Sequence, residues 1–270
     1  MRINKEESFV IRAAGHTDIG CVRIRNEDAY FLDIPHGILI VADGLGGHSG
    51  GDKAANMATT LLPGIIARRI KESTTPRSSG DQINAKILAQ SLDELSSRIR
   101  KAGNSQLEYT GMGTTVVATL LTARHAHIAY MGDSRAYLFR ENRMIQITED
   151  HSIVALLVRH GEITQQEAEF HPAKGRLSRF AGMDSEGSAA TITIELQAGD
   201  RLLLCTDGLW GMLPEAKIND ILGGGHDSTE TCRSLLENGI IAGGQDNLTA
   251  IVADILDDDI HVGSSPDAPL

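Results

Sequence analysis

The 270-residue sequence predicts an α+β fold that combines antiparallel sheets with a small number of helices. Short runs rich in β-branched and other apolar residues are typical of strands. These runs are residues 9–13, 29–34, 37–42, 114–121, 126–131, 135–139, 191–196, 201–206 and 247–254. Many of them follow one another with no helical pattern between them. Because parallel strands need a long crossover connection, this order favours antiparallel sheets over a regular βαβ winding.

Two long amphipathic helices are predicted to interrupt the strands. Between residues 52 and 71, apolar residues recur at helical spacing, although Pro63 can kink the segment. A second apolar stripe runs from residue 83 to residue 99, and Asp81 is the expected N-cap of that helix. Two further helical patterns precede the final strand, at residues 214–222 and 228–238.

The length suits one large domain, which we expect to span residues 1–256. Between residues 150 and 182, two short helical patterns are interspersed with His, Lys and Arg, and we expect about residues 153–179 to form a mobile flap over a site. The tail, residues 257–270, is polar and contains Pro and Gly. This composition predicts a disordered end.

Composition and charge exclude several classes of function. The formal net charge of −11 argues against non-specific nucleic-acid binding, which depends on a basic surface, and it suits cation binding better. No apolar run reaches the roughly 18 residues of a membrane span, and the N-terminus lacks the apolar region of a signal peptide. We therefore expect a cytoplasmic protein that does not enter a membrane.

The three cysteines, Cys21, Cys205 and Cys232, form no C-x-x-C pair. A disulfide framework and a cysteine zinc site are therefore both disfavoured, and a reducing cytosol fits. A phosphatase with a cysteine nucleophile would need an arginine six positions after the cysteine, and none of the three has one.

Acidic residues recur where the apolar runs begin or end. These residues are Glu27, Asp28, Asp43, Asp133, Asp207 and Asp246. An Asp next to Gly is by itself a common turn pattern. Together, however, several converging carboxylates without an equal number of bases would repel one another, and divalent cations are the usual remedy. Ligands that are all oxygen favour Mg²⁺ or Mn²⁺ over Zn²⁺.

Such a site predicts chemistry on phosphate. A pair of divalent cations can hold a bridging hydroxide near neutral pH and neutralise the charge of a phosphoryl group. An orienting donor is still needed, and a bidentate guanidinium is the apt group. Arg23, just upstream of the Glu27 and Asp28 pair, is the candidate, and Arg25 is its competitor.

The glycine-rich segment at residues 44–51 suggests a nucleotide-binding loop as an alternative. Its spacing does not match G-x-G-x-x-G, because position 49 is Ser49, and Asp43 would repel a pyrophosphate. Asp52 stands where a P-loop needs lysine. A non-enzymatic binding module with the same fold remains open, although an intact set of carboxylates is costly to keep without metal. Trp210 could line the site or belong to the core.

The chain strongly resembles the metal-dependent serine/threonine protein phosphatases of the PPM (PP2C) family, in their compact bacterial form. The matching segments, in the family's order over about residues 10–255, are TDIGCVRIRNEDA, VADGLGGHSGGDKAA, GMGTTVVATLL, AYMGDSRAYLFR, ITEDHS, LSRFAG, LLLCTDGLWGML and GGQDNLTAIVAD. Singly, motifs such as GDSR are weak, but together they are highly specific. The resemblance implies a four-layer αββα architecture, with a central sandwich of two antiparallel sheets flanked by helices.

The resemblance also implies two Mn²⁺ or Mg²⁺ ions at one end of the sandwich, and a third, weaker ion. The matching ligand positions are Glu27, Asp28, Asp43, Gly44, Asp133, Asp207 and Asp246. Asp43 would bridge the two metals, Gly44 would offer its carbonyl, and Asp133 with Asp207 would hold the third ion. Glu27 and Asp28 would act largely through bound waters. Arg23 would hold the substrate phosphate.

The implied reaction is hydrolysis of phosphoserine or phosphothreonine by in-line attack of a metal-bound hydroxide. Animal members resemble DGH at this position, where the histidine is the general acid, but this chain has Leu45. The proton donor is then a metal-bound water, or else His48. The implied partners are phosphorylated proteins, among them a bacterial Ser/Thr kinase that the enzyme opposes or a forkhead-associated protein. We expect a monomer.

Overall fold

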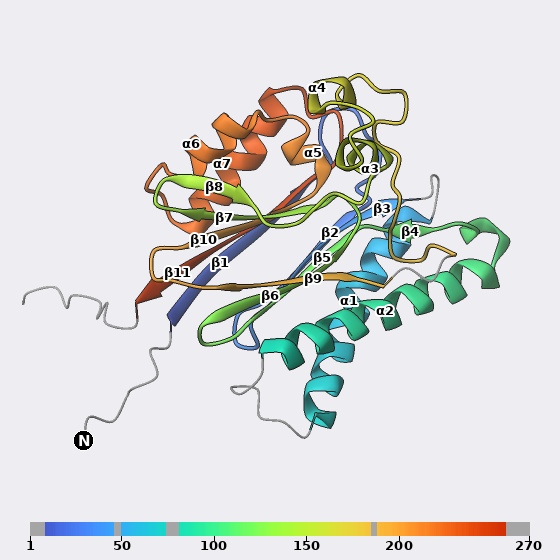
Figure 1. Cartoon of the computed structure of the whole chain (residues 1–270), viewed down its shortest axis with the longest axis horizontal. Coiled ribbons are helices and arrows are strands. Elements are labelled where there is room, and N and C mark those ends of the chain that lie inside the picture. Colours follow the sequence, from blue (N-terminus) through green and yellow to red (C-terminus); the bar gives the residue numbers. More distant parts are fainter. Residues whose placement is uncertain (1–8, 46–49, 74–80, 185–187, 258–270) are drawn as a thin grey trace, which may run out of the picture.

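A computed structural model of the chain describes residues 9–45, 50–73, 81–184 and 188–257 (Figure 1). The predicted disordered tail lies outside these residues, except for Asp257, which ends the last strand. His48 also lies outside them. In the described part of the chain, no helix combines the length and the apolar character needed to cross a bilayer.

Two antiparallel sheets form the centre of the molecule. One has the strand order β1-β11-β10-β7-β8 and the other β2-β3-β5-β6-β9, with the short β4 paired to β3. The strands of the first sheet are β1 (Phe9–Asp18), β7 (Arg135–Arg140), β8 (Arg143–Gln146), β10 (Arg201–Cys205) and β11 (Leu248–Asp257). Those of the second are β2 (Asp28–Asp33), β3 (Ile38–Leu45), β4 (Gly113–Thr114), β5 (Val116–Leu121), β6 (His125–Met131) and β9 (Ala190–Glu195).

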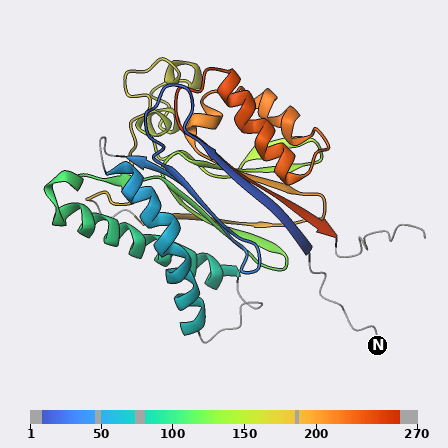
Figure 2. The same cartoon turned by 180° about the vertical axis from the view of Figure 1, so that it is seen from behind.

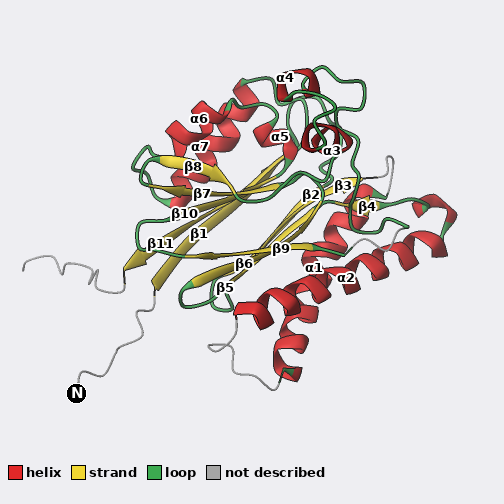
Figure 3. Cartoon of the chain, viewed as in Figure 1, coloured by secondary structure: helices red, strands yellow, loops and turns green. Residues whose placement is uncertain are grey.

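Helices cover the outer face of each sheet, which makes four layers (Figures 1 and 2). The helices α1 (Gly51–Glu72) and α2 (Asp81–Ser105) cover the second sheet. The outer face of the first sheet is covered by α5 (Asp207–Trp210), α6 (Glu215–Leu222) and α7 (Ser228–Ile241). Figure 3 shows the sheets as two adjacent layers between the red helices. The predicted antiparallel α+β class and the four-layer sandwich are confirmed.

The layered packing explains the continuous apolar run in β3. Leu39 and Val41 belong to the core between the sheets, whereas Ile38 and Ile40 belong to the core under α1 and α2. Because both faces of β3 are buried, both sets of alternating side chains are apolar. A third core, which includes Leu203, lies between the first sheet and α6 and α7.

All nine predicted strands exist, and the predicted run at 114–121 is divided between β4 and β5. β8 was not predicted, because its residues RMIQ lack β-branched character except at Ile145. It is joined to β7 by Glu141 and Asn142, both at positive φ, a geometry typical of tight hairpins. Asp81 is the first residue of α2 rather than the residue before it. α1 continues through Pro63.

The segment predicted as a flap contains α3 (Ile153–Arg159) and α4 (Gln165–Ala168). Both lie at one end of the sandwich (Figure 1). Two isolated β-bridges attach this region to the body and to itself, Thr114 with Ala181 and Ser152 with Leu177.

Candidate active site

The second sheet brings two of the acidic residues face to face. Asp28 begins β2 and pairs directly across the ladder with Asp43 on β3. Side chains of directly opposed residues lie about 5 Å apart at Cβ, so two carboxylates there repel each other. Asp28 is buried, and Asp43 is partly buried.

The first sheet contributes acids from its end nearest this pair. Asp207 begins α5 directly after β10, and Asp246 precedes β11, which runs antiparallel to β10. The end of one strand therefore lies beside the start of the other. The charges of Asp207, Asp133 and Asp246 all act on Asp43, so acids from both sheets meet at one end of the sandwich.

Burial and mutual repulsion hold protons on this cluster. Burial, followed by the charges of neighbouring carboxylates, raises the pKa of Asp28 to about 7 and the pKa of Asp133 to about 7. The same causes raise the pKa of Asp43 well above its ordinary value, and they raise the pKa of Asp207. A hydrogen bond joins the Asp43 and Asp207 side chains and opposes part of the rise in the pKa of Asp207.

Arg23 supplies a positive charge at the edge of the cluster. Its Nη2 atom lies 2.6 Å from Oδ2 of Asp246, and its side chain is 52% exposed. The hydrogen bond to Asp246 raises the pKa of Arg23, and the charges of Asp43 and Glu27 add to the rise. Arg23 therefore faces the carboxylates and solvent together, whereas Arg25 presents its backbone carbonyl to Asn247.

The carboxylates of this cluster are suited to bind a divalent cation. The acids whose charges act on one another come from five separate segments and supply only oxygen ligands, as Mg²⁺ and Mn²⁺ prefer. Within the described residues, no three His, Cys, Asp or Glu side chains are arranged to hold a metal as they stand. Because the pKa values of Asp43 and Asp207 are raised, metal binding would displace protons from these carboxylates.

Comparison with known proteins identifies the family of this chain. A family model described as protein phosphatase 2C matches residues 22–242. The chain belongs to the protein phosphatase 2C family. The serine/threonine phosphatase stp of Listeria welshimeri is 36% identical over 247 residues, which are 90% of this chain and 96% of that protein.

Solved structures of family members share the whole fold. Stp1 of Staphylococcus aureus has a TM-score of 0.82 at 29% identity, over 94% of this chain and 99% of that one. The catalytic domain of the phosphatase PstP in complex with two manganese ions has a TM-score of 0.78 at 32% identity, over 93% of this chain and 100% of that one. The family resemblance expected from the motifs is thereby confirmed.

Glu27 and Gly44 lie next to each other at the start of α1. The Gly44 amide donates to the Glu27 carbonyl at 3.1 Å. A Cβ on Gly44 would lie 2.1 Å from the carbonyl oxygen of Gly51, so this phosphatase 2C member has room only for glycine there. The Glu27 carboxylate faces Gly51, because a Cβ on Gly51 would lie 2.7 Å from Glu27 Oε2.

Asp133 lies in a loop fixed from two sides. The Trp210 indole donates to the Asp133 carbonyl at 3.0 Å, and the same ring packs under the Arg135 guanidinium at 3.4 Å. Arg135 makes a bidentate ion pair with Asp150 at 2.9 and 2.7 Å. Trp210 therefore holds the Asp133 loop through its indole, and it also packs against the third core.

Hydroxyl groups that the motifs did not single out support the acids. Thr206 Oγ1 donates to Asp28 Oδ2 at 2.8 Å. Thr115 Oγ1 accepts from the Asp43 amide at 3.1 Å, and the Thr115 amide donates to the Asp43 carbonyl at 2.8 Å. Thr206 directly precedes Asp207 in the sequence, and this adjacency was the only available pointer to it.

Asn247 is the main functional residue that motif reasoning missed. Its side chain is buried, and Oδ1 accepts from the Glu27 amide at 2.8 Å. Its Nδ2 donates to the carbonyls of Ile19 and Arg25, both at 2.9 Å. These three bonds hold both ends of the loop that carries Arg23. The DN pair of Asp246 with Asn247 was visible in the sequence, but only its acid was assigned a role.

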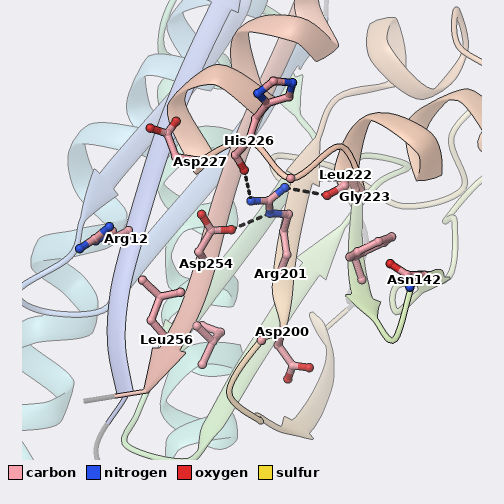
Figure 4. Close-up of a pocket in the computed structure, with 14 residues that line it drawn as sticks. Arg12, Asn142, Asp200, Arg201, Leu222, Gly223, His226, Asp227, Asp254 and Leu256 are labelled. Atoms are coloured by element: carbon pink, nitrogen blue, oxygen red, sulfur yellow. Dashed lines mark hydrogen bonds and ion pairs between the residues drawn. The ribbon is translucent and has the colours of Figure 1, made fainter. Parts of the chain in front are cut away.

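A hollow that includes part of the first sheet lies at the other end of β10 and β11. It has a volume of about 430 Å³, and Arg201 and Asp254 line it (Figure 4). The Arg201 guanidinium is fully engaged there, by Asp254 at 2.6 Å and by the carbonyls of Leu222 and His226. This hollow is distinct from the acidic cluster of the phosphatase 2C site.

Proposed function

We propose that this chain is a divalent-metal-dependent protein phosphatase that hydrolyses phosphoserine and phosphothreonine esters. The observation that carries the proposal is a buried cluster of carboxylates with raised pKa values, faced by Arg23. Family membership adds support, because the relatives are named serine/threonine phosphatases.

The acids at the cluster would hold Mn²⁺ or Mg²⁺. The proposed ligands are Glu27, Asp28, Asp43, Gly44, Asp133, Asp207 and Asp246. Asp43 would bridge two ions, a role supported by the acids from both sheets whose charges act on it, and Asp133 with Asp207 would hold a third ion. When bound, the ions supply a hydroxide nucleophile near neutral pH and neutralise the phosphoryl oxygens.

Arg23 would bind and orient the substrate phosphate. Its guanidinium is half exposed, and Asp246 engages one of its nitrogens, so other N–H groups remain for phosphate oxygens. The hydrogen bonds of Asn247 hold the loop that carries it, which fixes the phosphate for in-line attack. No covalent intermediate with the protein forms. The leaving group takes its proton from water, because Leu45 replaces the histidine of animal members.

We further propose that residues 1–256 act as one cytoplasmic phosphatase domain, as a monomer, with residues 153–179 as a flap. The substrates would be phosphorylated proteins of a signalling pathway, such as a Ser/Thr kinase that the enzyme opposes or a forkhead-associated protein. The net charge of −11 disfavours nucleic acid as a partner.

The test is hydrolysis of p-nitrophenyl phosphate and of a phosphothreonine peptide after EDTA treatment, with Mn²⁺ titrated back. Activity restored by metal and abolished by Asp207→Ala supports the proposal. Arg23→Ala should raise KM, and Arg25→Ala is its matched control from the same loop. A folded chain that turns over neither substrate with any divalent metal would instead be a binding module.

A further inference from the structure

Exposed apolar side chains are concentrated in the loop that carries Arg23. In the described residues, nine large apolar side chains are exposed. Three of these nine lie in one six-residue stretch, residues 19–24, of the loop before β2. They are Ile19, Val22 and Ile24, with exposed fractions of 39%, 64% and 93%. Val22 and Ile24 are the two chain neighbours of Arg23. Scattered exposed apolar residues are ordinary, but a group at a candidate binding residue indicates an interaction site.

The backbone of this loop is tied down by polar contacts. The Cys21 amide donates to the Gly244 carbonyl at 2.7 Å, and the Gly20 amide donates to Asp18 Oδ1 at 2.8 Å. Gly20 has a φ of +76°, and a Cβ there would lie 2.3 Å from the Asp246 carbonyl oxygen. Together with the three bonds from Asn247, these contacts fix the course of the loop. The exposed apolar side chains therefore belong to a loop whose backbone is fixed.

We propose that Val22 and Ile24 bind an apolar side chain next to the phosphorylated residue of the substrate. This inference rests on the proposed function, because it takes Arg23 as the group that binds the phosphate. Adjacent Cα atoms are about 3.8 Å apart, and an extended peptide rises about 3.3 Å per residue. With the phosphate on Arg23, substrate residues one or two positions away come within reach of Val22 and Ile24.

The charges around the loop favour this occupant over an acidic one. Asp246 lies 2.6 Å from Arg23, and the charge of Glu27 also acts on that guanidinium. Acidic side chains flanking the phosphorylated residue would be repelled by this cluster. An aliphatic or aromatic side chain would instead remove exposed surface of Val22 and Ile24 from water, at about 25 cal/mol per Å². The substrate class is thus a phosphopeptide with an apolar residue adjacent to the phosphoryl group.

The experiment compares two phosphothreonine peptides that differ only in flanking residues, Leu in one and Ser in the other. The full chain with Mn²⁺ should prefer the Leu peptide by roughly five- to tenfold in kcat/KM. The double variant Val22→Ser with Ile24→Ser should lose this preference. Its hydrolysis of p-nitrophenyl phosphate, which has no flanking residues, should not change. Val10→Ser, another exposed apolar residue at the far end of β1, should keep the preference.

Two results with the peptides overturn the inference alone, while p-nitrophenyl phosphate is still hydrolysed by the wild type. One is equal use of the two peptides by the wild-type chain, and the other is an unchanged preference in the double variant. Loss of p-nitrophenyl phosphate hydrolysis in the double variant also overturns it, since the side chains would then act on Arg23. A wild-type chain that hydrolyses nothing overturns the proposed function itself and this inference with it.

Discussion

Buried carboxylates have different partners at the two ends of the five-stranded sheet. At the end lined by the hollow, Asp254 pairs with Arg201 at 2.6 Å, and Asp200 receives two bonds of 2.7 Å from Arg140. At the other end, the side chain of Asp207 lies against another acid, Asp43, and the charge of Asp246 also acts on it. The same sheet therefore pairs Asp254 and Asp200 with arginines at one end. At the other end buried acids face one another, and Arg23 pairs with the more exposed Asp246.

This difference separates structural charges from functional ones. A buried acid with its own arginine is a closed pair whose loss costs stability. A buried acid that faces other acids destabilises the fold unless a proton or a metal joins it, so such a cluster persists because of what it binds. The contrast yields four predictions.

The largest effect is expected at the end of the sheet where buried acids face one another. Asp43→Asn removes the residue that meets acids from both sheets, and it should lower kcat for p-nitrophenyl phosphate at least about a hundredfold in saturating Mn²⁺. Without metal, its free energy of unfolding should not fall, because one repelling charge is gone. Steady-state kinetics and urea denaturation check both parts. Full activity in this variant would remove Asp43 from the metal site.

At the end of the sheet where acids pair with arginines, a substitution should lower stability and leave turnover nearly unchanged. Asp254→Asn leaves the buried Arg201 guanidinium without its counter-ion, and it should lower the free energy of unfolding by about 3 kcal/mol. The turnover of the folded fraction should stay within about twofold, since the pair lies eight residues along β11 from Asp246. A large loss of turnover at unchanged stability would mean that the two ends are coupled.

A smaller effect is expected where the cluster meets the Arg23 loop. Asn247→Ala removes the hydrogen-bond partners of the Glu27 amide and of two carbonyls, so the loop loses its fixed course. We expect KM to rise roughly tenfold with a smaller change in kcat, as for weakened positioning of the phosphate. Substrate titration at saturating Mn²⁺ measures both constants. An unchanged KM would show that other contacts hold the loop.

The smallest effect, counted per pH unit, is expected for the dependence of metal-free stability on pH. Asp28 and Asp133 have pKa values of about 7 in the fold, against 3.8 ordinarily, because burial and neighbouring acids disfavour their charge. Between these values the folded chain holds protons that the unfolded chain has released. Metal-free stability should therefore fall as pH rises through this window, by up to about 1.4 kcal/mol per unit for each proton.

Mn²⁺ should flatten or reverse this slope, because metal takes the place of the protons and binds more tightly as pH rises. Urea denaturation in EDTA and in Mn²⁺, across the same pH series, makes the comparison. A metal-free chain that becomes more stable from pH 4 to pH 7 would contradict the raised pKa values of the two acids.

Much of the fold followed from local patterns. Period-two runs and helical stripes depend only on neighbouring residues, so all nine expected strands and the main helices were found. β8 was missed because an exposed edge strand has no apolar pattern to mark it. The start of α5 at Asp207 was missed because a four-residue helix is too short to show a period.

The sequence by itself determined which residues could form the site, because acids at the ends of apolar runs are visible one by one and the motifs around them are specific. It did not determine which of them meet. The pairing of Asp28 with Asp43 depends on strand register, and the bond from the Glu27 amide to Asn247 joins residues 220 positions apart. Burial decided the rest, since only the packed sandwich removes the acids from water and raises their pKa values.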